Sequence, residues 1–135
     1  MYIIQHIVLE DFDMEELYEQ QIEALEIAVP YCDRMSAALK QIIKELTDEK
    51  QEDTDEYIVT ILNGLNWIFS VFNGTQDLIN KDTVVIDKDI VNESVSMLNE
   101  GNEAKDDQKR AQAFEGILKF VEKFREVAAN LSVAG

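Results

Sequence analysis

The chain has 135 residues, 46% of them hydrophobic, which is enough for one domain with a packed core. Its 28 acidic and 12 basic residues give a net charge of −16, which repels phosphate backbones and anionic lipids and so argues against nucleic acid and membrane as partners. One proline and five glycines are too few turn formers for a fold of many strands, so we expect a helix-rich protein.

The first nine residues, MYIIQHIVL, are rich in β-branched side chains and predict a short extended arm over residues 1–12. They lack the basic start of a secretory signal, and the acidic Glu10 and Asp11 follow at once. Cys32 is the only cysteine, so no intrachain disulfide can form. We therefore expect a cytoplasmic protein.

The first helix has the clearest start signal in the chain, because Asp13 can cap it and Glu16 follows three residues later. Apolar residues then recur in one stripe from Leu25 to Leu46, and the stripe stays in phase across Pro30. A turn between two helices would reset this phase. The pattern therefore predicts a single helix over residues 14–47, kinked near Pro30.

The second helix is predicted over residues 55–73, within twenty consecutive uncharged residues (57–76) of a chain that is 30% charged. We expect it to end at Gly74. One face carries the apolar core stripe. The back would face water in a monomeric bundle, yet it carries a tryptophan and two valines where glutamate and lysine are expected. We therefore predict an interface formed by Val59, Asn63, Trp67, Ser70 and Val71.

There are two alternatives for what packs against this face. The internal one is the N-terminal arm, in contact through Tyr2, Ile4 and Ile7, and paired with a short strand at residues 83–86. The other is a second protein chain, either a client or a second copy that forms a homodimer. Both apply if the arm crosses to a twofold mate.

The last two helices are predicted over residues 88–100, ended by Gly101, and over residues 103–131. The first of them has a short apolar face formed by Ile90, Val91, Val95 and Leu98. The second is an ordinary amphipathic helix that buries Ala113, Phe114, Ile117, Val121, Phe124, Ala128 and Leu131.

The two halves of the chain resemble each other in sequence. The similarity indicates either an internal repeat or a coincidence among apolar helices. A shift of 52 residues aligns ILNGLNWIFSVF (61–72) with AFEGILKFVEKF (113–124) and places Gly64 on Gly116. Because glycine costs about 1 kcal/mol inside a helix, the matched pair indicates close helix crossings. Each half reads as helix, connector, helix. We therefore predict one all-α domain over residues 1–135, a four-helix bundle built from two helical hairpins.

Residues suited to catalysis are scarce. The single histidine, His6, lies in the arm, and Cys32 belongs to the apolar stripe of the first helix, so neither serves a triad or a zinc site. No glycine-rich phosphate loop precedes a lysine. We expect no catalytic residue and no cofactor.

One acidic pattern leaves an enzyme as the alternative. Its spacing resembles the EExxE…ExxD signature of the all-α nucleoside triphosphate pyrophosphohydrolases, which implies clustered carboxylates that hold magnesium against a triphosphate. The residues in this pattern are Glu15, Glu16, Glu19, Glu45 and Asp48. A single helix places Glu19 and Glu45 roughly 39 Å apart, too far to share a metal. Only a hairpin at Pro30 would bring them together.

The matched segments ILNGLNWIF and AFEGILKFVEKF, each with a glycine one turn before an aromatic or apolar pair, resemble small acidic helical proteins of Gram-positive bacteria described as domains of unknown function. The resemblance spans roughly residues 20–130 and implies no functional residue. The predicted bundle is also similar to flagellar export chaperones, which have apolar client-binding grooves. We expect a non-enzymatic protein-interaction module, an adaptor or a chaperone.

Overall fold

The structure, a computed structural model, describes residues 14–134. Within this range it contains no strand, and its four helices are α2 (Met14–Thr47), α3 (Thr54–Ile79), α4 (Lys88–Ala104) and α5 (Asp107–Ala134). The prediction of an all-α bundle is confirmed for these residues. The arm predicted at residues 1–12 lies outside the described part of the chain, together with the predicted cap at Asp13.

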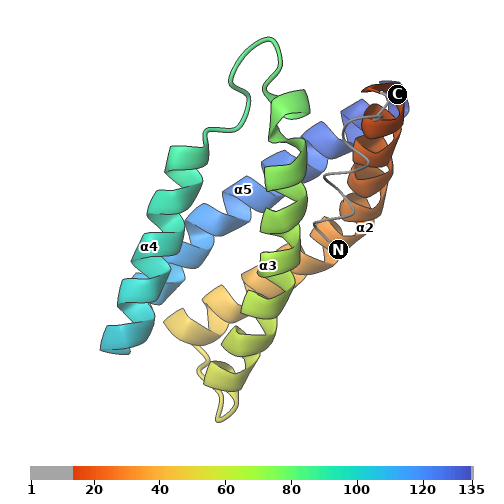
Figure 1. Cartoon of the computed structure of the whole chain (residues 1–135). Helices are drawn as coiled ribbons and strands as arrows, with labels where there is room; N and C mark the ends of the chain where they lie inside the picture. The colour runs from red at the N-terminus through yellow and green to blue at the C-terminus, as the bar shows by residue number, and fades with distance from the viewer. Residues whose placement is uncertain (1–13, 135) are drawn as a thin grey trace, which may run out of the picture.

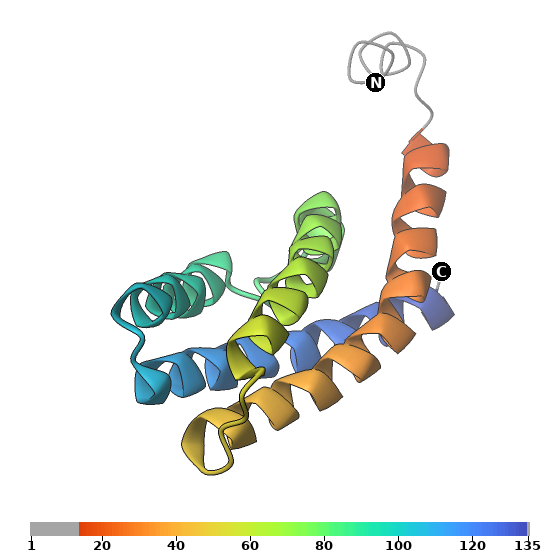
Figure 2. The same ribbon diagram turned by 90° about the horizontal axis from the view of Figure 1, so that it is seen from below.

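The helices pair as two hairpins, α2 with α3 and α4 with α5, and the most extensive packing joins α2 to α5 (Figure 1). Figure 2 shows α3 and α4 on one side of the bundle, with α5 and the second half of α2 on the other. The predicted construction from two helical hairpins is therefore present.

Helix α2 is one helix of 34 residues with the predicted bounds, and it contains Pro30. Proline cannot donate a backbone hydrogen bond and crowds the preceding turn, so it favours a kink. Figure 2 shows that α2 bends near its middle and that its first half reaches the level of α3. One side of the helix is buried on both sides of Pro30, through Ile22, Leu25, Ala28, Cys32, Met35, Leu39, Ile42 and Leu46.

Phenylalanines join α3 to α5 in the core. The rings of Phe120 and Phe124 stack with centroids 5.7 Å apart, and Phe72 meets them edge-on at 5.2 and 5.9 Å. Phe69, which is half-buried, contacts Phe120 at 5.5 Å. Phe120 is also buried, a core position that was not predicted from the sequence. The other core positions predicted for α5 are buried, except that Leu131 is half-buried.

Helix α3 does not end at Gly74, as predicted, but continues to Ile79. Gly74 has no left-handed backbone angle. Beyond it, Thr75 and Ile79 are buried and extend the apolar stripe by another turn. Burial of these two side chains outweighs the weak stop signal of a single glycine.

The strand predicted at residues 83–86 is wrong, because these residues form a loop between α3 and α4. Asn80 organises this loop with its side chain. Its Oδ1 accepts hydrogen bonds from the backbone N–H groups of Val85 and Ile86 at 2.9 and 3.1 Å, and its Nδ2 donates to the Ile86 carbonyl at 3.1 Å. These bonds satisfy the backbone groups that a strand partner would have satisfied.

Helix α4 begins at the predicted residue, and the Asp87 side chain caps it by accepting from the Asp89 N–H at 2.9 Å. Its predicted apolar face is only partly buried. Val91 and Leu98 are buried and Val95 is half-buried, but Ile90 is 63% exposed. Ile90, which was predicted to share one apolar face with Val91, Val95 and Leu98, therefore does not contribute to the buried side of α4.

The junction between α4 and α5 lies later than predicted, because α4 passes Gly101 and ends at Ala104. Lys105, and not Gly101, ends the helix, in the left-handed conformation with φ of 52°. The Asp106 N–H returns to the Gly101 carbonyl at 2.9 Å, as in a Schellman motif. The Asp106 side chain then accepts from the Lys109 N–H, so α5 starts at Asp107 instead of residue 103.

Both repeat-related glycines lie where two helices of a hairpin approach closely. A Cβ atom on Gly64 would lie 2.6 Å from the Met35 Cε atom of α2, and one on Gly116 would lie 3.2 Å from the Ser94 Cβ atom of α4. The close crossings predicted from the repeat are confirmed.

Alanine substitutions at two other glycines, Gly101 and Gly74, are expected to change the free energy of unfolding in opposite directions. A Cβ atom on Gly101 would lie 2.9 Å from Arg110 Cγ and 3.1 Å from its backbone nitrogen, which cannot move aside as a side chain can. We expect Gly101→Ala to lower the free energy of unfolding by about 1–3 kcal/mol. Gly74 has no atom within 4 Å of such a Cβ. Because alanine is the better helix former, Gly74→Ala should raise stability by about 1 kcal/mol. Urea unfolding followed by circular dichroism measures both changes, and equal signs would contradict this packing.

Candidate interaction surface

The uncharged residues 57–76 all lie within α3. Their apolar stripe faces the core as predicted. Five of its members are buried, while Leu62 and Phe69 pack against the core half-buried; the buried ones are Ile58, Ile61, Leu65, Ile68 and Phe72. The remaining faces of α3 therefore decide whether the helix offers an interaction surface.

The structure separates the predicted interface residues into two groups. Val59 is 58% exposed, and Asn63 and Ser70 are also exposed. Trp67 and Val71 are half-buried and pack against the core. The predicted arm contacts Tyr2, Ile4 and Ile7 lie outside the described residues.

Helix α2 covers part of Trp67, a contact that was not predicted from the sequence. The rings of Tyr31 and Trp67 contact each other with centroids 4.7 Å apart and an interplanar angle of 41°. The Arg34 guanidinium lies 5.4 Å from the centroid of the same tyrosine ring. Tyr31 follows Pro30 directly, so the ring pair lies near the bend of α2. The bend thus brings a second aromatic side chain to the predicted face.

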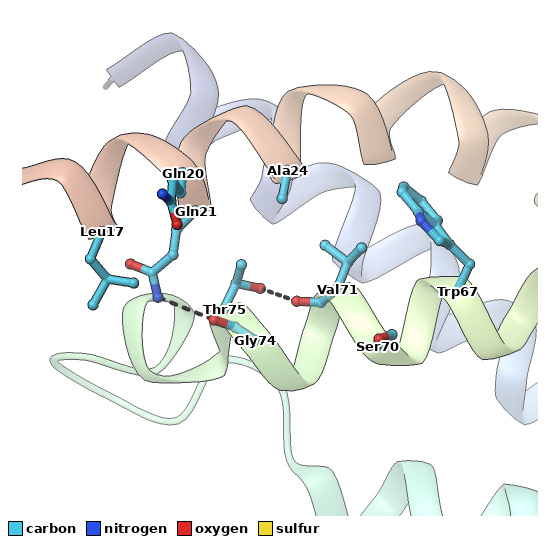
Figure 3. A pocket seen from close by; sticks show the side chains of 9 residues that line it. All are labelled: Leu17, Gln20, Gln21, Ala24, Trp67, Ser70, Val71, Gly74 and Thr75. Carbon is cyan, nitrogen blue, oxygen red and sulfur yellow. Dashed lines mark hydrogen bonds between the residues drawn. The ribbon is translucent and has the colours of Figure 1, made fainter. Parts of the chain in front are cut away.

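A hollow of about 280 Å³ opens between the first half of α2 and the second half of α3 (Figure 3). We call it the Val71 hollow; it is lined by Leu17, Gln20, Gln21, Ala24, Trp67, Ser70, Val71, Gly74 and Thr75. The Gln21 side chain reaches across it from α2, and its Nε2 donates a hydrogen bond to the Gly74 carbonyl at 3.2 Å. None of the lining side chains is charged, and three of the five interface residues predicted on α3 lie here.

A second hollow of about 380 Å³, the Tyr57 hollow, also lies between α2 and α3. Its lining includes Tyr31, Arg34 and Ala38 of α2 and Tyr57 and Asn63 of α3. Burial raises the pKa of Tyr57 above its ordinary value, and the negative charge of Glu45 adds to the effect. Tyr57 therefore stays a neutral hydrogen-bonding phenol at physiological pH. The two hollows together with the Tyr31–Trp67 pair are called the α2–α3 face below.

The acidic pattern that suggested a magnesium enzyme is spread over both ends of one continuous helix. Glu15, Glu16 and Glu19 lie in the first two turns of α2, whereas Glu45 lies in its last turn and Asp48 just beyond it. Within the described residues, no group of three or more His, Cys, Asp or Glu side chains is placed to hold a metal ion.

Glu45 has a structural partner that explains its burial. It is only 6% exposed, and its carboxylate accepts from Thr54 Oγ1 at 2.8 Å and from Gln41 Nε2 at 3.0 Å. Thr54 Oγ1 in turn accepts from the Gln51 N–H at 2.8 Å. This network connects the end of α2 to the start of α3 and uses Glu45 to close the hairpin.

The only cysteine is inert by its position. Cys32 is fully buried in the α2 stripe, and burial raises the pKa of its thiol to about 12, with Asp33 adding to the rise and Arg125 opposing it. A thiol that stays protonated is not a nucleophile. His6 lies outside the described residues.

A protein-family model with the description "Domain of unknown function (DUF8042)" matches residues 23–127, a span that includes all five interface residues predicted on α3. No curated protein and no solved structure matches the chain. Among the described residues, none of the helices has the length and apolar character needed to cross a membrane.

Proposed function

The chain belongs to the family DUF8042, a domain of unknown function, and we propose that it is a non-catalytic protein-interaction module, an adaptor or a chaperone, that binds through its α2–α3 face. The partner is another protein or a second copy of the chain, as in a homodimer, and not nucleic acid. The place of action is the cytoplasm. The proposal includes the absence of a cofactor.

The observation that carries this proposal is the chemistry of α3. The helix is uncharged from residue 57 to residue 76, while the outward positions of α5 carry Glu115, Lys119, Glu122 and Glu126, all exposed. Both helices face the same core, so core packing does not account for the difference. A surface with a single charged lining residue, Arg34, and with an aromatic pair between two hollows is typical of protein interfaces.

Site-specific photo-crosslinking tests the proposal. A photoreactive amino acid at Asn63 or at Ser70 puts the probe at an exposed position of the α2–α3 face, and one at Lys119 puts it on the charged surface of α5 as a control. In the native cell we expect adducts with another chain from positions 63 and 70 only. An adduct of twice the chain mass identifies a second copy, and light scattering on the purified protein checks that state.

Equal adducts from position 119, or none from any position, would contradict the proposed interaction surface. Magnesium-dependent release of pyrophosphate from a nucleotide by the purified protein would contradict the non-catalytic part. These outcomes are independent, because the first concerns the α2–α3 face and the second concerns carboxylates elsewhere on α2.

A further inference from the structure

Arg34 is the only one of the three arginines that has no carboxylate partner among residues 14–134. The buried Arg110 contacts two aspartates, and Arg125 contacts Asp33 at 3.0 Å. Arg34 is exposed on α2. The chain has 28 acidic residues against 12 basic ones, so carboxylates are abundant, yet none of those described pairs with this arginine.

Aromatic rings hold the Arg34 guanidinium at the edge of the α2–α3 face. Its central carbon lies 5.4 Å from the centroid of the Tyr31 ring, and the same ring contacts Trp67 at 4.7 Å. A cation over an aromatic ring keeps its N–H donors, and a guanidinium has five of them in a fork that matches a carboxylate. Tryptophan, tyrosine and arginine are also the residue types that dominate the binding energy of protein interfaces. The guanidinium is therefore positioned, but not used, within the described chain.

The Tyr57 hollow, of about 380 Å³, places apolar surface beside this guanidinium. Its lining includes the buried Met35 and Ile61 and the exposed amide of Asn63. Arg34 is the only charged residue among the described residues that line it, and no acidic side chain is among them. The hollow therefore suits a ligand that combines an apolar group with one negative charge.

We infer that the Tyr57 hollow binds a segment of a different protein, in which an apolar side chain enters the hollow and a neighbouring aspartate or glutamate accepts hydrogen bonds from Arg34. Because Arg34 belongs to the α2–α3 face, this partner rests on the proposed function. Arginine donates two parallel hydrogen bonds to a carboxylate, and such charge-assisted bonds are stronger than neutral ones. The net charge of −16 repels any further negative charge on the ligand, so the segment carries little of it. A second copy of the chain fits less well, because it brings another −16 charges.

The probe is a synthetic 18-residue helical peptide of leucine, alanine and glutamine, with a leucine stripe and a single central glutamate beside it. Its matched controls carry glutamine or lysine in place of that glutamate. Trp67 is the only tryptophan of the protein and contacts Tyr31, so a change in its emission reports binding. We expect the glutamate peptide to bind about tenfold more tightly than the glutamine peptide, and the lysine peptide to bind most weakly. The net charge of −16 favours the opposite order, so the expected order identifies local recognition by Arg34.

Substitutions of Arg34 locate the carboxylate. Arg34→Gln should weaken the glutamate peptide about tenfold and so abolish its advantage over the glutamine peptide. Arg34→Glu should reverse the order, so that the lysine peptide binds most tightly. Lys119→Gln is the matched control, because it removes one positive charge from an exposed position of α5, and it should leave all three affinities unchanged. Circular dichroism checks that each variant is folded.

The same variants test the partner in the native cell. Asn63 lines the Tyr57 hollow, so a photoreactive amino acid at this position reports what occupies it. We expect Arg34→Gln to reduce the yield of the position-63 adduct, and Lys119→Gln to leave it unchanged. The cross-linked segment, identified by mass spectrometry, should contain an aspartate or a glutamate within one helical turn of an apolar residue.

The possible outcomes separate the carboxylate-bearing partner from the proposed function. If the glutamine or the lysine peptide binds as tightly as the glutamate peptide, or if Lys119→Gln weakens binding as much as Arg34→Gln, recognition of a carboxylate is wrong, whereas adducts from positions 63 and 70 would still support the interaction surface. A position-63 adduct of twice the chain mass would overturn the different protein in favour of a second copy. If no peptide binds, a position-63 adduct that falls in Arg34→Gln supports the inference, and an unchanged one overturns it. If no peptide binds and neither position gives an adduct, both proposals fail.

Discussion

Phe124→Ala is expected to reduce the free energy of unfolding by about 3–5 kcal/mol, because truncation of a fully buried phenylalanine removes apolar burial and leaves a cavity. Phe124 is 0% exposed and contacts Phe120 and Phe72 at 5.7 and 5.9 Å between ring centroids. Domains of this size are stable by about 5–15 kcal/mol, so the variant should approach the limit of folding. Urea unfolding followed by circular dichroism measures the change.

Phe69→Ala is the matched control for this prediction. The same side chain is removed, but Phe69 is half-buried and has one ring contact, to Phe120 at 5.5 Å. We expect a clearly smaller loss, because less surface returns to water and the site can open to solvent instead of keeping a void. Equal losses for the two variants would show that the phenylalanine cluster is not the centre of the α3–α5 packing.

Helical periodicity explains why much of the fold was predictable. The apolar stripe from Leu25 to Leu46 has a single phase, which is set by local sequence and survives the bend at Pro30. The glycine pair at 64 and 116 was informative for a related reason, since glycine inside a helix needs a compensating contact. Both signals depend on residues a few turns apart.

Helix ends were harder to predict, because they depend on distant contacts. Gly74 and Gly101 carry the usual stop signal, yet α3 and α4 both continue past them. Thr75 and Ile79 are buried after the first glycine. Arg110 of the next helix lies so close to Gly101 that it leaves no room for a side chain there. Lys105, an unremarkable residue in sequence, takes the left-handed turn. Tertiary packing decides each of these ends.

The candidate site was predictable only on α3. The absence of charge pointed to the helix and to four residues that line the two hollows, Asn63, Trp67, Ser70 and Val71, whereas the predicted Val59 lines neither. A helical wheel cannot show which neighbouring helix lies beside these residues. Tyr31, Leu17 and Gln21 reach the α2–α3 face because α2 bends toward α3. The aromatic contact between Tyr31 and Trp67 spans 36 positions in sequence, and no local pattern predicts it.

Cys32 should react with a thiol reagent about a thousandfold more slowly in the folded protein than in the unfolded chain. At pH 8 an ordinary cysteine, with a pKa of about 8.5, is roughly one-quarter thiolate. With its pKa raised to about 12 by burial, Cys32 is thiolate in only about one molecule in ten thousand. Ser96→Cys adds an exposed thiol to the same molecule, so one equivalent should react fast and the other slowly.

The raised pKa of the Cys32 thiol also predicts how the free energy of unfolding changes at alkaline pH. Because the folded state holds the Cys32 proton more tightly, its contribution is complete below the unfolded pKa of about 8.5 and is lost as pH rises toward 12. Cys32→Ala should therefore flatten the alkaline decline of the unfolding free energy relative to the parent protein. Rapid labelling of both thiols in Ser96→Cys would mean that the buried side of α2 opens locally, since global unfolding is too rare to expose it.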